Sequence, residues 1–98
     1  MKEITAKELK QKYAAGEKLN IIDVREDEEV AMGKIPGAKH IPLGQIPERM
    51  KELDRNKQYY IVCRSGGRSG NACRFLHHEG YDVTNVAGGM LEWEGETE

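Results

Sequence analysis

The chain has 98 residues, of which 38% are hydrophobic and 33% charged, so we expect residues 1–98 to form one domain around one core. The net charge of −2 and the lack of a basic stripe argue against a nucleic-acid partner. No apolar run approaches the ~18 residues of a membrane span and no signal-peptide stretch is present, so we expect a cytoplasmic protein without a membrane partner. Two cysteines are too few for a disulfide framework or a four-cysteine metal site, and no cofactor is expected.

The first patterned segments are a helix and a buried strand. The run Thr5-Ala6-Lys7-Glu8 matches a capping box, which predicts a helix that ends after Ala15, before Gly16. The segment Leu19–Val24 is almost continuously apolar, which is typical of a central parallel strand buried on both faces. A short acidic helix is predicted over Arg25–Met32.

Further along the chain, strands and helices continue to alternate. Ile41-Pro42-Leu43 is predicted to be a short extended piece, and Pro47 suits the first turn of the next helix. The apolar run Tyr59–Val62 predicts a second buried strand. A helix is predicted over Ser69–Glu79 and a last strand over Asp82–Val86. Alternating strands and helices predict an α/β fold, with a parallel sheet that is covered on both faces.

The loop after the second buried strand holds the best candidate for chemistry. Cys63 lies at the carboxyl end of that strand, where open α/β sheets bind ligands. The candidate binding residues that follow it supply backbone N–H groups, hydroxyls or positive charge, and they are Arg64, Ser65, Gly66, Gly67, Arg68 and Ser69. Backbone donors and a helix N-terminus stabilise thiolates and bind anions. The loop therefore predicts a reactive thiol that faces a small anionic substrate.

Cys63 needs a lowered pKa to act as a nucleophile. A free thiol has a pKa of ~8.5, and a helix N-terminus with nearby arginines lowers it to roughly 3.5–7.5. The three histidines lie elsewhere in the sequence, which argues against a histidine-assisted hydrolase. A thiolate in an anion cradle without a general base suits sulfur transfer. It would attack the outer sulfur of a thiosulfate-like donor, release sulfite, and hold a persulfide for a thiol or cyanide acceptor.

Matches to a known family run along nearly the whole chain in the family's order. The matching segments are Ile21-Ile22-Asp23-Val24-Arg25, Gly33-Lys34-Ile35-Pro36-Gly37-Ala38, His40-Ile41-Pro42-Leu43, Cys63-Arg64-Ser65-Gly66-Gly67-Arg68-Ser69, Gly80-Tyr81, and Gly88-Gly89-Met90 with Trp93. In these segments the chain resembles the single-domain rhodaneses. One departure is Lys34, where the family often has histidine, and we expect only a local change there.

This resemblance implies an open, parallel five-stranded sheet flanked by helices on both faces. It also implies a thiosulfate sulfurtransferase with Cys63 as persulfide carrier, and it places Arg64 and Arg68 where family members bind the anionic donor. The spacing from Cys63 to Arg68 is Cys-x4-Arg, whereas related cysteine phosphatases carry a Cys-x5-Arg loop whose wider cradle suits phosphate. The sequence therefore favours sulfur transfer over a cysteine phosphatase or arsenate reductase.

Several of these residues also have structural interpretations. For Cys63, the alternative to a nucleophile is a buried structural thiol. Cys73 is expected to pack in the core and not to act as a resolving thiol. Asp23 and Arg25 are expected to form an ion pair or hydrogen bonds that fix the loop after their strand, rather than to act in catalysis. His40 is expected to make structural hydrogen bonds near the site.

Two questions stay open in the sequence. The small size implies a shallow, exposed site, so the domain is alternatively a sulfur-relay or regulatory binding module loaded by a protein persulfide donor. A protein donor or acceptor is then a partner beside small anions such as thiosulfate. Met90 and Trp93 either wall the site or close the core.

Overall fold

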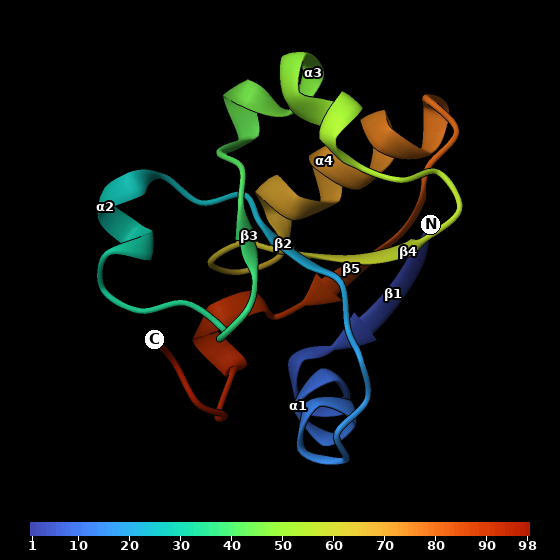
Figure 1. Cartoon of the computed structure of the whole chain (residues 1–98). Coiled ribbons are helices and arrows are strands. Elements are labelled where there is room, and N and C mark those ends of the chain that lie inside the picture. The colour runs from blue at the N-terminus through green and yellow to red at the C-terminus, as the bar shows by residue number, and fades with distance from the viewer.

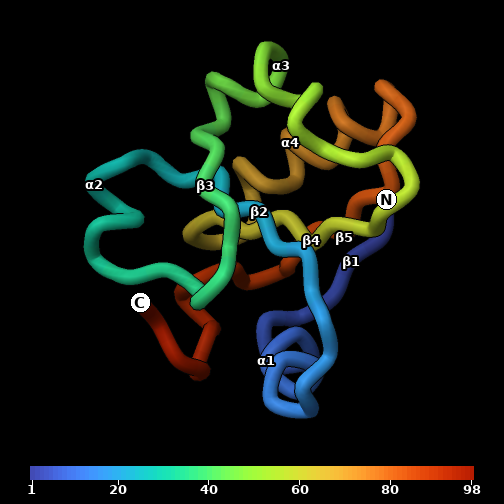
Figure 2. Tube along the Cα trace, in the orientation of Figure 1, coloured from blue at the N-terminus to red at the C-terminus, as the bar shows by residue number.

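Five parallel strands form one sheet in the computed structural model, which describes residues 1–98 (Figures 1 and 2). The strand order is β1-β5-β4-β2-β3, and every neighbouring pair is parallel. The strands are β1 (Lys2–Thr5), β2 (Ile21–Asp23), β3 (Lys39–His40), β4 (Gln58–Val62) and β5 (Asp82–Ala87). This arrangement confirms the predicted open, parallel five-stranded α/β fold.

Helices cover both faces of the sheet (Figure 1). One face carries α1 (Ala6–Ala14) and the C-terminal 3-10 turn η3 (Gly89–Glu92), and the other carries α3 (Ile46–Arg49) and α4 (Gly67–His78). The remaining short helical pieces are α2 (Asp27–Val30), η1 (Leu43–Gln45) and η2 (Met50–Glu52). None of these helices is long and apolar enough to cross a bilayer.

Alternation along the strands builds a separate core on each face of the sheet. In β2, Ile22 packs on the α4 side and Ile21 on the α1 side, which confirms the prediction that both faces of this strand are buried. In β4, Ile61 faces the α4 side and Val62 faces the α1 side. Cys63 continues this alternation into the α4-side core, directly before the helix that covers it.

The first helix begins as its capping box predicts. The backbone N–H of Glu8 donates to Thr5 Oγ1 at 3.0 Å, and the backbone N–H of Thr5 donates to Glu8 Oε1 at 3.0 Å. Gly16 follows the end of the helix with φ of +80°, a conformation that favours glycine. The capping box therefore fixes where the chain leaves β1 and enters α1.

The sequence patterns predict neither β1 nor β3. β1 buries only Ile4, and β3 has two residues. Neither segment is long enough to show the alternation of apolar and polar residues by which a strand is recognised in a sequence. The predicted extended piece Ile41–Leu43 lies directly after β3. The N–H groups of Ile41 and Leu43 donate to the carbonyls of Asp23 and Val24 at 3.0 Å each, so this piece continues the contact with the β2 segment.

Two helices differ in length from the prediction. α2 covers only Asp27–Val30, whereas an acidic helix was expected over Arg25–Met32. α4 begins at Gly67, two residues before the expected Ser69, because Gly66 adopts φ of +110° and turns the chain directly into the helix. Arg68 and Ser69 consequently belong to the first turn of α4 and not to the loop before it.

Candidate active site

Cys63 follows β4 at the carboxyl end of the sheet, as predicted, and the next residues curl around its sulfur. Its side chain is buried, with 1% of the residue exposed. The backbone N–H of Gly66 donates to Cys63 Sγ at 3.1 Å, and the hydroxyl of Ser69 donates to the same atom at 3.3 Å. The structure therefore brings the thiol, the glycine turn and the start of α4 together.

The two thiols of the chain have opposite tendencies to ionise. Burial opposes ionisation of Cys63, but hydrogen bonds from the Ser69 side chain and from the backbone N–H groups of Ser69, Gly66 and Ser65 outweigh it, so the pKa of Cys63 falls below its ordinary value. Burial raises the pKa of Cys73 to about 12. Cys73 is fully buried in the α4-side core, which confirms the expected core position.

Asn85 on β5 holds Ser69 in place, and sequence reasoning missed it. Ser69 Oγ donates to Asn85 Oδ1 at 2.6 Å, and Asn85 Nδ2 donates to the carbonyl of Gly66 at 3.2 Å. Because the amide nitrogen faces a carbonyl, the amide oxygen must face Ser69, so one hydroxyl proton serves both Asn85 Oδ1 and Cys63 Sγ. The signal in the sequence is weak, because Asn85 is one of three polar residues in β5, with Asp82 and Thr84.

The turn after β5 supports the loop from outside. The N–H groups of Met90 and Leu91 donate to the carbonyls of Cys63 and Arg64 at 2.9 and 3.0 Å. Gly89 has φ of +53°, and a Cβ on it would lie 2.4 Å from the Cys63 oxygen and 2.6 Å from the Arg64 oxygen. Only glycine allows this approach. The loop carbonyls are thus held outward, and the N–H side of the loop is left to face the thiol.

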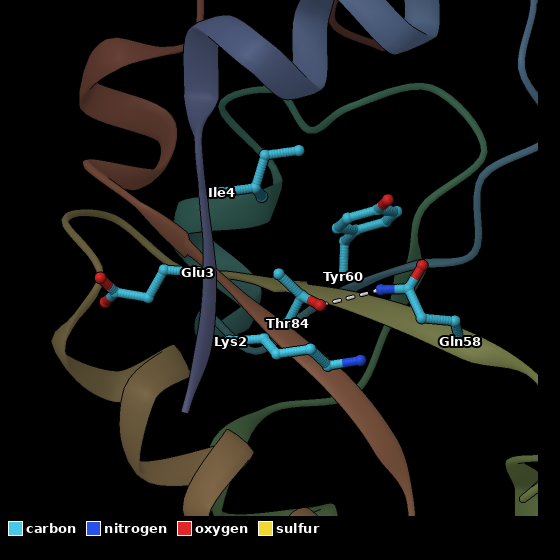
Figure 3. A pocket seen from close by; sticks show the side chains of 6 residues that line it. All are labelled: Lys2, Glu3, Ile4, Gln58, Tyr60 and Thr84. Atoms are coloured by element: carbon cyan, nitrogen blue, oxygen red, sulfur yellow. Dashed lines mark hydrogen bonds between the residues drawn. The ribbon is translucent and has the colours of Figure 1, made fainter.

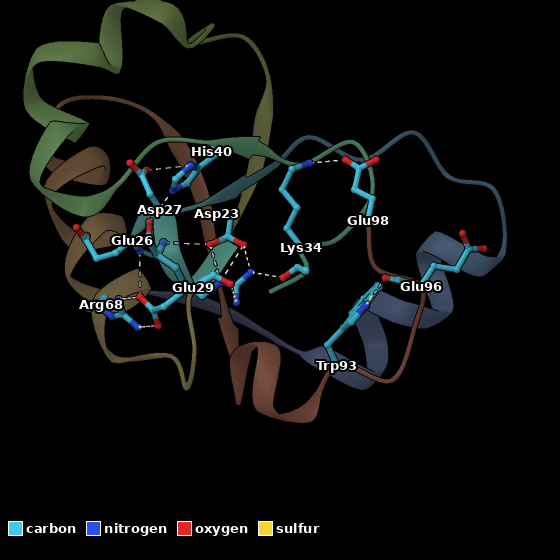
Figure 4. A network of polar contacts seen from close by, with 12 residues as sticks. Asp23, Glu26, Asp27, Glu29, Lys34, His40, Arg68, Trp93, Glu96 and Glu98 are labelled. Atoms are coloured by element: carbon cyan, nitrogen blue, oxygen red, sulfur yellow. Dashed lines mark hydrogen bonds and ion pairs between the residues drawn. The ribbon is translucent and has the colours of Figure 1, made fainter. Parts of the chain in front are cut away.

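The two predicted anion-binding arginines are placed differently. Arg64 is exposed and has no ion-pair partner. Arg68 Nη1 and Nη2 donate to the two carboxylate oxygens of Glu29 at 2.6 and 2.7 Å (Figure 4). The hydrogen bonds from Arg68 lower the pKa of Glu29 to about 2. Arg64 is therefore the free cation at the loop, while Arg68 ties α4 to α2.

A buried ion pair fixes the segment that carries α2. Arg25 Nε and Nη2 donate to Asp23 Oδ1 and Oδ2 at 3.0 and 2.8 Å, as expected from the sequence. The same guanidinium donates to the carbonyls of Glu29 at 3.4 Å and Gly33 at 2.7 Å. His40 Nε2 donates to the Arg25 carbonyl at 2.6 Å, which confirms its structural role. Figure 4 shows these contacts as one network beside the Arg68–Glu29 pair.

The contacts of Trp93, Met90 and Lys34 show which part of the fold each of these residues supports. Trp93 is buried and packs edge-on against Tyr13, with ring centroids 5.9 Å apart, so it closes the α1-side core. Met90 packs against the same core and also lines a hollow beside Arg64. Lys34 forms an ion pair with Glu98, so the departure from the family pattern creates a contact with the C-terminal segment (Figure 4).

An open hollow of about 460 Å³ lies on another part of the sheet (Figure 3). It is lined by Lys2, Glu3, Ile4, Gln58, Tyr60 and Thr84, and Gln58 Nε2 donates to Thr84 Oγ1 at 3.0 Å. Its β4 residues precede the carboxyl end where Cys63 lies, and no thiol lines it, so we place the candidate site at the Cys63 loop. No group of three or more His, Cys, Asp or Glu side chains is arranged to hold a metal ion.

Comparisons with known proteins agree with this geometry. The model of the rhodanese-like domain matches residues 5–96. YtwF of Bacillus subtilis, named as a putative sulfurtransferase, is 56% identical over 97 residues, which cover 99% of this chain and 94% of that protein. YrkF of the same organism, named as a putative sulfur carrier protein, is 47% identical over 98% of this chain and 52% of its own length.

Solved structures show the same likeness. The crystal structure of a rhodanese-like domain protein from Staphylococcus aureus matches with a TM-score of 0.94 and 46% identity, over 100% of this chain and 97% of that one. The matched region includes the strand before Cys63, the loop and α4. From its fold and its sequence, the chain belongs to the rhodanese-like domain family.

Proposed function

We propose that the chain is a sulfurtransferase that carries a sulfane sulfur as a persulfide on Cys63. The observation that carries this proposal is the surroundings of Cys63 Sγ, which accepts hydrogen bonds from Gly66 at 3.1 Å and Ser69 at 3.3 Å. These donors favour the thiolate, which is the nucleophilic form, and they are suited to hold a persulfide anion in the same cradle. Membership of the rhodanese-like family and relatives named for sulfur transfer and sulfur carriage support this class of reaction.

The proposed reaction has two balanced steps. The Cys63 thiolate attacks the outer sulfur of thiosulfate, a bond forms between the two sulfurs, and the bond to the sulfonate sulfur breaks. Its electron pair leaves with sulfite, and a persulfide anion remains on Cys63. Cyanide or a thiolate then attacks the outer sulfur, and the electron pair of the broken S–S bond returns to Cys63. The exposed guanidinium of Arg64 attracts the anionic donor to the loop.

The surrounding carboxylates favour sulfur transfer over phosphate hydrolysis. A phosphatase needs a general acid to protonate its leaving group, whereas sulfite leaves without a proton. Glu29 is held by Arg68 with its pKa lowered to about 2, so it does not supply a proton at neutral pH, and Asp23 is occupied by its buried ion pair with Arg25. The four-residue spacing between Cys63 and Arg68 supports the same choice.

We also propose that residues 1–98 act as one domain in a reducing compartment such as the cytoplasm. Both cysteines are free thiols, and a reducing compartment keeps a nucleophilic thiol available between turnovers. The transferred sulfur is carried by the protein itself, so the proposed reaction uses no metal or organic cofactor.

Turnover of thiosulfate and cyanide, followed as thiocyanate, tests the proposal. Cys63→Ser should abolish turnover while the circular dichroism spectrum stays unchanged. Cys73→Ala is the matched control, because this thiol lies in the core with a pKa raised to about 12, and it should retain turnover. Full turnover by Cys63→Ser would contradict the assignment of the nucleophile.

A further inference from the structure

Two exposed apolar side chains lie together beside the Cys63 loop. Met32 is 89% exposed and Leu91 is 61% exposed, and the only other exposed large hydrophobic residue is Met1. Both line a hollow of about 240 Å³ whose other residues are Arg25, Glu29, Arg64 and Met90. Figures 1 and 2 show α2, the loop after β4 and the C-terminal turn at the same end of the sheet. The fold thus brings distant apolar residues to the same hollow.

The backbone under both side chains is fixed by hydrogen bonds. Arg25 donates to the carbonyls of Glu29 and Gly33, on either side of Met32, and is itself held in a buried ion pair. The N–H of Leu91 donates to the Arg64 carbonyl at 3.0 Å. Because the backbone is already fixed, a partner that covers these groups orders only their side chains and not the chain itself. This is the arrangement expected of a preformed contact surface.

The one unpaired charge among the residues that line this hollow is positive. The carboxylate of Glu29 is neutralised by Arg68, and the charge of Arg25 is neutralised by its buried partner. Arg64 is left as the unpaired charge, between the loop and the hollow. A complementary partner therefore presents a negative group beside an apolar one.

The dimensions of the hollow favour a protein partner over a small organic ligand. A volume of about 240 Å³ is below the roughly 300–1,000 Å³ typical of small-molecule sites. Methionine adapts its shape to a partner surface better than branched side chains do. Thiosulfate and cyanide are too small to use Met32 and Leu91, so these residues are free to serve a larger sulfur acceptor.

We propose that a docking surface formed by Met32, Leu91 and Arg64 binds a protein segment that carries a cysteine flanked by an apolar side chain and a carboxylate. This inference rests on the proposed function, because the segment's thiolate is the sulfur acceptor. The thiolate attacks the outer sulfur of the Cys63 persulfide, a new S–S bond forms on the partner, and the electron pair of the broken bond returns to Cys63. The apolar contacts and Arg64 orient the segment for this attack.

Peptide binding tests the docking surface without any sulfur chemistry. Three fluorescent pentapeptides are compared by anisotropy: Gly-Leu-Ser-Glu-Gly, Gly-Ser-Ser-Glu-Gly and Gly-Leu-Ser-Lys-Gly, with serine in place of the reactive cysteine. We expect the first to bind about tenfold more tightly than either of the others. The double variant Met32→Ser/Leu91→Ser should remove the preference for leucine over serine. The control Gln11→Ser, an exposed change on α1, should keep it.

Sulfur transfer to the same peptides with cysteine restored gives the second measurement. Protein loaded with thiosulfate and freed of small molecules should transfer sulfur about tenfold faster to the leucine–glutamate peptide. Met32→Ser/Leu91→Ser should abolish this preference and leave the rate with cyanide unchanged. If cyanide and peptides both fail to take up sulfur, the proposed function is wrong, whereas the anisotropy result still decides the docking surface.

Two results would overturn the inference. One is equal binding of the three peptides by the wild-type protein, or a preference that the double variant retains. The other is a concentration-dependent dimer of the wild-type protein that Met32→Ser/Leu91→Ser abolishes, because the apolar pair then contacts a second copy of this chain.

Discussion

The hydroxyl of Ser69 lies 3.3 Å from Cys63 Sγ and is the only side-chain donor to this sulfur. The same hydroxyl lies 2.6 Å from Asn85 Oδ1, so its proton has two acceptors of different charge. When Cys63 is a thiol, the amide oxygen is the stronger acceptor. When Cys63 is a thiolate, the anion competes for the proton, and charge-assisted hydrogen bonds are the stronger kind. Ionisation of Cys63 should therefore draw the Ser69 proton away from Asn85 on β5 and toward the thiolate.

Ser69→Ala should raise the pKa of Cys63, because it removes a donor to the thiolate and leaves the backbone donors in place. Less thiolate is then present at a given pH, so alkylation by iodoacetamide should be about tenfold slower at pH values below the pKa, as expected for the loss of one hydrogen bond to a charged group. The pH dependence of the alkylation rate, measured in a Cys73→Ala background, reports this shift.

Ser65→Ala is the matched control for that experiment. The Ser65 side chain is exposed, and its contribution to the thiolate comes from the backbone N–H, which alanine retains. Its alkylation profile should match that of the wild type. An unchanged profile for Ser69→Ala would show that the hydroxyl does not stabilise the thiolate.

Gly89→Ala should disturb the loop from the outside. The new Cβ would lie 2.4 Å from the Cys63 carbonyl oxygen, and the residue has φ of +53°. Strain of this kind costs of order 1–3 kcal/mol, and the displaced carbonyls should also reduce sulfur transfer. Thermal unfolding should show a loss of several degrees, since about 1 kcal/mol corresponds to roughly 4–8 °C in a domain of this size.

Gly44→Ala provides the control for Gly89→Ala. A Cβ at Gly44 meets nothing within 4 Å, and its φ is not positive. We expect a change within about ±0.5 kcal/mol and full activity. Equal stability and activity for the two alanine variants would contradict the role given to the η3 turn.

The Glu29–Arg68 pair should make stability depend on pH in the acidic range. The pKa of Glu29 is lowered to about 2 in the folded chain, against ~4.3 when unfolded. The pair thus stabilises the fold fully above about pH 4.3, and this contribution is lost as the pH falls through about 2. Because both side chains are partly exposed, we expect about 1 kcal/mol and not the full value of the shift.

Urea unfolding at several pH values between 7 and 2.5 measures this contribution. Glu29→Gln should be about 1 kcal/mol less stable than the wild type at pH 7, and the difference should shrink toward pH 2.5. Glu28→Gln, an exposed neighbour outside the pair, should show no comparable change. A difference between Glu29→Gln and wild type that is constant with pH would contradict the assignment.

Local patterns in the sequence predict the elements that bury continuous apolar runs. Leu19–Val24 and Tyr59–Val62 are mostly apolar and mostly buried, so β2 and β4 follow directly from the sequence. The position of Cys63 follows as well, because a cysteine that ends such a run lies at the carboxyl edge of the sheet. The edge strands are short and mostly polar, and they depend on pairing with the rest of the sheet.

The supports of the site depend on contacts between distant segments, which local patterns do not contain. Asn85 reaches Ser69 only because β5 pairs with β4. In the sequence Glu29 is part of an ordinary acidic run, and its ion pair with Arg68 follows only from the fold, which places the two side chains together. Gly89 is recognisable as a turn residue, but its carbonyl contacts are not.

The intact mass of reduced protein after incubation with thiosulfate tests the central claim most directly. We predict that the wild type gains the mass of one sulfur atom, that Cys73→Ala gains the same mass, and that Cys63→Ser gains none. Cyanide should then remove the added sulfur and release thiocyanate. A wild-type protein with a free Cys63 thiol and no added mass, or a Cys63→Ser variant that still gains sulfur, would contradict a persulfide on Cys63.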